Sequence, residues 1–208
     1  MYEKYLKRML DFILSLLALI VLMPVMIVIG IIVKLDSKGT VFFKQERLGK
    51  NGKIFKIIKF RTMVMNAEHI GDGLKVKSEQ DNRITRIGKI LRKTSLDELP
   101  QLINVVKGEM SLIGPRPPVT YHPHKYEEYS EEQKQRFLVR PGITGLAQVK
   151  VRNSATWDER IEIDREYLKD ITFKNDFKII LKTVISIFKK QNIYQYKGEM
   201  EKKENVRV

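Results

Sequence analysis

Two adjacent carboxylates, Asp97 and Glu98, are the residues of this 208-residue chain whose type and position best suit chemistry. They follow Thr94-Ser95 and lead into residues 99–106, whose apolar spacing predicts a helix. Both would then lie in the first helical turn, where backbone N–H groups and the helix dipole stabilise negative charge. Ser95 and Glu98 also fit a capping box, which is a purely structural reason for an acidic first turn. The two carboxylates alone therefore leave a catalytic and a capping role open.

Basic residues in short elements bounded by glycine and proline favour the catalytic role, because arginine and lysine side chains neutralise phosphate. The set consists of Lys59, Arg61, Arg92, Lys93, Arg116, Arg140 and Arg152. A carboxylate kept ionised at a helix N-terminus can attack phosphorus and form an acyl phosphate, provided that a divalent cation screens the repulsion. Mg²⁺ suits a site built from oxygen and phosphate ligands. The chain has no Walker-type or Rossmann glycine pattern, so kinase and dehydrogenase functions have no support.

The composition limits the partners. The chain has 39 Lys+Arg against 25 Asp+Glu, a surplus that attracts nucleic acid, anionic lipid or phosphorylated substrates. The basic stretches 84–93 and 178–190 contain few of the interleaved aromatics that bind bases, which disfavours nucleic acid. The absence of cysteine excludes disulfides and fits a reducing compartment. The three histidines are a weak basis for a metal site, and we expect His122 and His124 at a surface or at the edge of a substrate site.

An uncharged apolar segment over residues 12–33 would reach about 33 Å as a straight helix, which is enough to cross a bilayer. Basic residues precede and follow it, so the positive-inside tendency acts on both ends. Pro24 near its middle predicts a kink or a break. A bent helix that enters and leaves by the cytoplasmic face satisfies both observations. A single-pass anchor with a proline kink and a buried soluble helix are the alternatives.

The rest of the chain predicts a small mixed domain. Residues 41–43 and 54–60 read as strands of a hairpin around the turn 49–52. Residues 64–82 read as a polar, mobile loop, residues 84–91 as a helix, and residues 130–133 as the capped start of another. From Asn175 onward, one helical face is apolar, and it predicts either core packing or a membrane-interface helix: Phe177, Ile180, Leu181, Val184 and Phe188. The charged tail from Gln195 predicts disorder.

Three longer motifs occur in the order found in one protein family: residues 95–101, 107–117 and 139–148. With them, the chain resembles the bacterial sugar transferase family of monotopic phosphoglycosyl transferases. The resemblance covers roughly residues 1–190 and also includes residues 7–11, 59–63, 152–153 and 164–167 and Trp157. It implies an α+β, mainly helical fold. Residues 1–36 would form a re-entrant helix-break-helix in the membrane, and residues 37–190 a cytoplasmic catalytic domain with a short β-hairpin and amphipathic interface helices. Residues 191–208 would remain as the charged tail whose composition predicts disorder.

The resemblance also implies the reaction. A sugar-1-phosphate would pass from a UDP-sugar to undecaprenyl phosphate with release of UMP, as the first membrane step of bacterial glycan assembly. Asp97 would be the nucleophile that forms a covalent phosphosugar intermediate, Glu98 would support the metal or the acceptor, and Mg²⁺ would be bound at both carboxylates. The implied substrate-binding residues are Lys59, Arg61, Arg92, Pro115, Arg116, Pro117, Arg140, Gln148, Arg152 and Asn153.

Two positions depart from the pattern that many relatives share. Met23 stands before the membrane proline where relatives often have serine, and residues 148–153 differ from the usual Gln-Val-Asn-Gly-Arg-Asn. No second apolar segment of membrane-spanning length precedes the catalytic motifs, so the resemblance is to the small, minimal members. The donor sugar, the glycan pathway and the oligomeric state stay open. A non-catalytic, membrane-anchored basic protein that binds anionic lipid or nucleic acid is the alternative to the enzyme.

Overall fold

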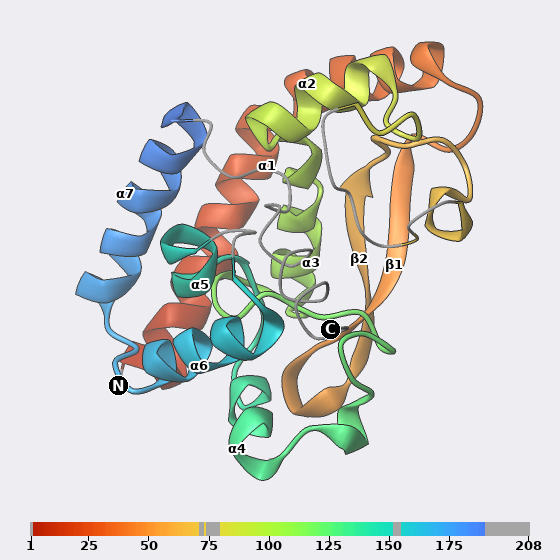
Figure 1. The fold of residues 1–208 in the computed structure, drawn as a ribbon. Helices are drawn as coiled ribbons and strands as arrows, with labels where there is room; N and C mark the ends of the chain where they lie inside the picture. The colour runs from red at the N-terminus through yellow and green to blue at the C-terminus, as the bar shows by residue number, and fades with distance from the viewer. Residues whose placement is uncertain (1, 71–72, 74–79, 152–154, 190–208) are drawn as a thin grey trace, which may run out of the picture.

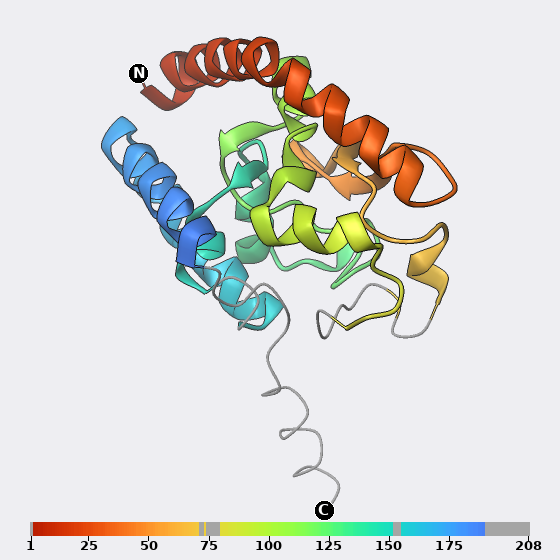
Figure 2. The same ribbon diagram turned by 90° about the horizontal axis from the view of Figure 1, so that it is seen from above.

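The computed structural model describes residues 2–70, 73, 80–151 and 155–189 (Figure 1). A short π-helical turn, Tyr2–Leu6, leads into the long helix α1, Lys7–Asp36. α1 is long and apolar enough to cross a membrane, and most of its apolar side chains are exposed. The helix stays continuous through Pro24 and bends near its middle (Figure 2). The predicted kink is therefore present, whereas the predicted break is wrong, because the proline is accommodated within the helix.

α1 is fastened to the rest of the molecule near both ends. Near its start, the Oδ2 atom of Asp11 accepts a hydrogen bond from the hydroxyl of Ser111 at 2.6 Å. Near its end, the guanidinium of Arg61 donates to the carbonyl oxygens of Ser37 at 2.6 Å and of Val33 at 3.2 Å. These contacts satisfy polar groups that would otherwise be buried without partners. They also hold one side of α1 against the domain and leave the other side free.

The predicted hairpin is confirmed. Strand β1, Phe42–Leu48, pairs antiparallel with β2, Ile54–Phe60, and β1 is longer than the sequence predicted. A second, parallel pair was not predicted: β3, Ser111–Ile113, with β4, Gly142–Thr144. A Cβ atom on Gly142 would lie 2.1 Å from the backbone nitrogen of Gly114, so this close approach requires glycine.

Helices make up most of the remainder, so the fold is mainly helical with small two-stranded sheets. They are α2, Arg86–Thr94; α3, Gln101–Lys107; α4, Glu131–Lys134; α5, Leu146–Lys150; α6, Trp157–Leu168; and α7, Phe173–Lys189. Short 3-10 turns lie at Lys50–Gly52, Ala67–His69, Leu96–Glu98, Tyr126–Glu128 and Gln135–Phe137. The capping box predicted before α4 is confirmed, because Ser130 accepts from the backbone N–H of Gln133.

α7 contacts the domain through Ile179, which is buried. Its predicted apolar face lies elsewhere: Phe177, Ile180, Leu181 and Val184 are 36–51% exposed. For these four side chains the core-packing alternative is therefore wrong. The side chain of Phe188 and the tail 191–208 lie outside the described residues, as does most of the stretch 71–79 within the predicted loop.

Candidate active site

The adjacent carboxylates lie in a 3-10 turn between α2 and α3. Ser95 adopts a left-handed conformation with φ 58°, and its backbone N–H donates to the carbonyl of Arg92 at 3.3 Å, so Ser95 terminates α2. An N-capping serine needs extended dihedral angles and a side-chain hydrogen bond, and Ser95 has neither. The predicted capping box is therefore wrong, and so is the placement of Asp97 and Glu98 in the first turn of an α-helix. Helix capping no longer explains why these two acids are present.

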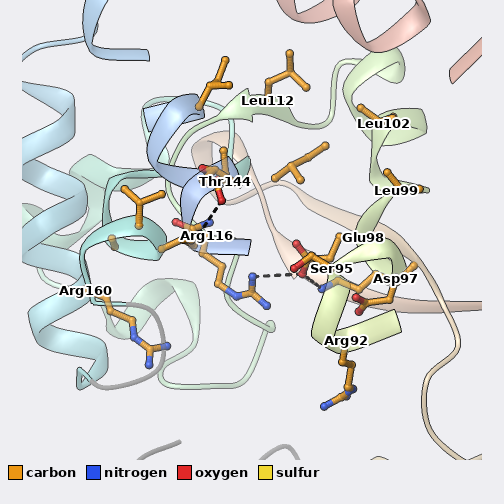
Figure 3. Close-up of a pocket in the computed structure, with 18 of the residues that line it drawn as sticks. Arg92, Ser95, Asp97, Glu98, Leu99, Leu102, Leu112, Arg116, Thr144 and Arg160 are labelled. Atoms are coloured by element: carbon orange, nitrogen blue, oxygen red, sulfur yellow. Dashed lines mark hydrogen bonds and ion pairs between the residues drawn. The ribbon is translucent and has the colours of Figure 1, made fainter. Parts of the chain in front are cut away.

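Glu98 is held by two basic side chains. Lys59, which projects from β2, donates to the Oε1 atom of Glu98 at 2.6 Å, and an Nη atom of Arg116 lies 3.6 Å from the same oxygen (Figure 3). Burial opposes ionisation of this carboxyl, but Lys59 and Arg116 outweigh it, so the pKa of Glu98 falls below its ordinary value. Burial is also the main reason that the pKa of Lys59 is lowered, although Glu98 opposes this shift. Glu98 is therefore a fixed anion at the centre of the site.

Asp97 is in a different state. No hydrogen bond reaches its carboxylate from the residues that the structure describes. Burial raises the pKa of Asp97 to about 6, and Glu98 adds to this, whereas Lys59, Arg92 and Arg116 act in the opposite direction. Asp97 is thus ionised at neutral pH, and no hydrogen bond must be broken before its oxygen can react.

Both carboxylates border one cavity of about 660 Å³, which is large enough for a nucleotide-sized ligand. At the carboxylate end the wall is charged, with Lys59, Arg92 and Arg116. Apolar side chains from α1, α3, β3 and α7 also line the cavity: Leu14, Ala18, Leu102, Leu112 and Ile180. The cavity therefore extends from the charged turn to the apolar helix α1.

Four of the substrate-binding residues predicted from the sequence line this cavity with the carboxylates: Lys59, Arg92, Arg116 and Gln148. Arg92 donates from Nε to the hydroxyl of Thr62 at 2.9 Å, which directs its guanidinium. The side-chain amide of Gln148 is buried, and none of the described residues forms a hydrogen bond with it. A buried polar group of this kind is costly unless a ligand or a water satisfies it.

Four other predicted binding residues, all within the described part of the chain, do not line the cavity: Arg61, Pro115, Pro117 and Arg140. Arg61 binds the end of α1, and Arg140 donates to the carbonyl of Gly108 at 2.8 Å, at the end of α3, where a positive charge complements the helix dipole. The backbone carbonyl of Pro115 accepts a hydrogen bond from the N–H of Gly142, and that of Pro117 accepts one from the side chain of Arg47. These two bonds shape the loop that carries Arg116. Arg152 and Asn153 lie outside the described residues, so their predicted roles stay predictions.

The structure adds residues that the sequence reasoning did not select. Arg136 and Asp164 form a 2.7 Å ion pair in the cavity wall, and their side chains are 1% and 2% exposed. Arg136 also donates to the backbone carbonyl of Arg116 at 2.8 Å, so the ion pair supports the loop of Arg116. Burial raises the pKa of Asp164 to about 6, against the effect of Arg136. Asp164 belonged to a recognised motif, whereas no local pattern distinguished Arg136.

The described residues contain no cluster of three or more His, Cys, Asp or Glu side chains that could hold a metal ion. The rings of His122 and His124 pack edge-on against Trp157 and Tyr129 instead. Mg²⁺ is commonly bound by one or two carboxylates together with substrate phosphates and water. The adjacent carboxylates at the cavity wall fit that arrangement, with the remaining ligands supplied by a diphosphate.

Residues 2–190 match the family model described as bacterial sugar transferase, and the chain belongs to this family. It is 39% identical over 193 residues to a UDP-glucose:undecaprenyl-phosphate glucose-1-phosphate transferase of Caulobacter vibrioides, covering 90% of this chain and 72% of the relative. A protein of the same name from Escherichia coli K12 is 40% identical over 92% of this chain and 42% of its own length. An undecaprenyl-phosphate galactose phosphotransferase of Salmonella typhimurium is 38% identical over 92% and 42%, respectively. The chain thus spans less than half the length of the latter two relatives.

Proposed function

We propose that this protein is a phosphoglycosyl transferase that moves a sugar-1-phosphate from a UDP-sugar to undecaprenyl phosphate and releases UMP. The observation that carries the proposal is the ionisable carboxylate of Asp97, beside the Lys59–Glu98–Arg116 group, in a cavity that extends to α1. The names of the relatives support both substrates. The product would be the first membrane-bound intermediate of a bacterial glycan.

In the first step, a carboxylate oxygen of Asp97 attacks the donor phosphorus that carries the sugar. The bond between this phosphorus and the oxygen that bridges the two phosphates breaks, and UMP leaves with that oxygen and the bonding electrons. The result is an acyl phosphate that joins the sugar-1-phosphate to Asp97. No proton has to move, because UMP departs as an anion.

The basic side chains stabilise the charge that develops during this step. Arg116 and Arg92 face the same cavity and would bind the diphosphate oxygens, which become more negative as the bridge breaks. Lys59 is held by Glu98, so its ammonium group is oriented before the donor arrives. Glu98 therefore has two roles: it positions the ammonium group of Lys59, and its negative charge favours the binding of Mg²⁺.

In the second step, a phosphate oxygen of undecaprenyl phosphate attacks the same phosphorus. The bond between phosphorus and Asp97 breaks, the carboxylate is regenerated, and the product is an undecaprenyl diphosphate that carries the sugar. Two displacements at one phosphorus make one carboxylate sufficient for both half-reactions.

Mg²⁺ is the cofactor that we propose for this site, held by Asp97 and Glu98 together with donor phosphate oxygens. It would supply charge screening between the attacking carboxylate and the diphosphate. The carboxylate oxygens of Asp97 are available to a metal ion, because they accept no hydrogen bond from the described part of the chain.

We further propose that α1 is re-entrant and that the catalytic domain lies on the cytoplasmic face of the bacterial membrane, where nucleotide sugars are made. The bend in α1, the basic residues on both of its sides and the exposed apolar face of α7 support this placement. A cysteine introduced at Tyr2 and another at Ser37 should both resist an impermeant thiol reagent applied outside intact cells. Labelling of either position from outside would contradict the re-entrant topology.

The decisive test of the function is a UMP-release assay of the purified full-length chain with Mg²⁺, undecaprenyl phosphate and a panel of UDP-sugars. UDP-glucose and UDP-galactose come first because relatives are named for glucose and galactose transfer. We expect at least one donor to give UMP and a lipid-linked sugar phosphate in equal amounts. Release of neither product with any donor would overturn the proposal, and release of UDP would indicate simple glycosyl transfer instead.

A further inference from the structure

Helices α1 and α7 start side by side and then diverge, as Figures 1 and 2 both show. A buried carboxylate joins them at the base of this opening. Asp176, at the start of α7, accepts hydrogen bonds from the hydroxyl of Tyr2 and the ammonium of Lys7, each at 2.7 Å. The hydroxyl of Tyr167 donates to its other oxygen at 2.8 Å. The base of the opening is therefore pinned.

Above this base, the two helices contribute facing walls to the active-site cavity. Leu14 and Ala18 come from α1, and Ile180 and Thr183 come from α7. The hydroxyls of Thr183 and Thr144 lie 2.7 Å apart, and this hydrogen bond holds α7 against β4 beside the cavity. The opening is thus continuous with the space that Asp97 borders.

The wall between the carboxylates and the opening is a series of apolar side chains. Leu99, Leu102 and Leu112 follow one another away from Glu98 in Figure 3, and all three line the cavity. The cavity wall is consequently cationic beside the carboxylates and becomes apolar along this row of leucines. This polarity matches a molecule with a phosphate head and a hydrocarbon tail, whereas a UDP-sugar has no apolar part for the second half.

We propose that the hydrocarbon chain of the polyprenyl phosphate acceptor reaches the site laterally, through the opening between α1 and α7. This opening is called here the α1–α7 portal, and it is formed by Leu14, Ala18, Ile180 and Thr183. The inference rests on the proposed function and adds the route of one substrate. The phosphate of the acceptor lies near Arg116, and its chain leaves between the two helices into the bilayer. The water-soluble donor does not use this route, so obstruction of the portal separates the two half-reactions.

The test uses the absence of cysteine from the chain. Ala18→Cys places a single thiol in the portal, and Val21→Cys places one on the same helix at a side chain that is 72% exposed and does not line the cavity. Each full-length variant is alkylated with N-benzylmaleimide, and intact-mass measurement verifies completion. The donor is the UDP-sugar that the unmodified chain turns over. The readouts are the phosphosugar adduct on the enzyme without acceptor and the lipid-linked product with undecaprenyl phosphate.

Alkylation at position 18 should lower product formation at least tenfold, relative to the same variant before alkylation, while the adduct still forms. Alkylation at position 21 should change neither. Ala18→Trp, which needs no labelling, should show the same separation between the two half-reactions. Equal product formation before and after alkylation of Ala18→Cys would overturn the portal, and so would loss of the adduct together with the product. An unmodified chain that releases no UMP from any donor would instead contradict the proposed function.

Discussion

Two ion pairs border the same cavity and differ in what surrounds them. The Lys59–Glu98 pair spans 2.6 Å with side chains 14% and 22% exposed, and the Arg136–Asp164 pair spans 2.7 Å with side chains 1% and 2% exposed. In both pairs a basic side chain satisfies a carboxylate at the cavity wall. Of the two acids, only Glu98 is partly exposed, so only the Lys59–Glu98 pair remains accessible from the cavity.

The Lys59–Glu98 pair has charged neighbours: Arg116 also pairs with Glu98, and Asp97 adds a second carboxylate that accepts no hydrogen bond from the described residues. The Arg136–Asp164 pair is almost completely buried, Arg160 also favours the ionised form of Asp164, and Arg136 also donates to the backbone carbonyl of Arg116. A carboxylate without a hydrogen-bond partner is available to a ligand, whereas a pair sealed from solvent is part of the framework. The comparison assigns chemistry to the first pair and support of the Arg116 loop to the second.

The largest effect is expected from removal of the carboxylate of Asp97. Asp97→Asn should lower UMP release by at least about a thousandfold, because the amide cannot act as the nucleophile. Fold and membrane association should persist, since the described residues form no hydrogen bond with this carboxylate. The assay is UMP release together with intact-mass detection of the adduct. Turnover within tenfold of the unmodified chain would show that another group is the nucleophile.

The second-largest effect concerns the buried Arg136–Asp164 pair and changes the stability of the fold. Asp164→Leu leaves the charge of Arg136 buried and unpaired, and should lower the free energy of unfolding by about 3–5 kcal/mol. Thermal unfolding of the purified protein measures this. Glu162→Leu on the same helix is the matched control, because the exposed Glu162–Arg165 pair is worth less than about 1 kcal/mol.

A double replacement sharpens the distinction between the pairs. Arg136→Met with Asp164→Leu removes both charges and should recover most of the lost stability. Equal unfolding temperatures for the two α6 variants, Asp164→Leu and Glu162→Leu, would argue against a structural role for the sealed pair.

The smallest effect is on the pH profile. The pKa of Asp97 is raised to about 6, so Asp97 is protonated below that pH and cannot attack phosphorus. The rate of adduct formation should therefore rise about tenfold per pH unit below 6 and level off above it. Lys59→Met should move the midpoint upward, because Lys59 lowers the pKa of Asp97. An adduct rate that does not change between pH 5 and 8 would contradict the assignment.

Local patterns in the sequence were sufficient for much of the fold and for the reactive pair. The apolar run of α1, the kink at Pro24 and the hairpin follow from hydropathy, proline chemistry and turn residues, which act over a few positions. Asp97 and Glu98 were identified by type, by neighbouring basic residues and by family motifs. Lys59, Arg92, Arg116 and Gln148 were likewise selected, and all four line the cavity.

Tertiary structure alone decided what those residues contact. The sequence between Ser95 and Glu98 satisfies the rule for a capping box, but the left-handed conformation of Ser95 ends α2 and excludes it. The sequence favours Arg61 as a phosphate-binding residue, but its guanidinium donates to the carbonyl of Ser37 at the end of α1. Arg136 pairs with a carboxylate 28 positions away. Such contacts depend on how distant segments pack, and a local pattern carries no information about which distant segment will neutralise a buried charge.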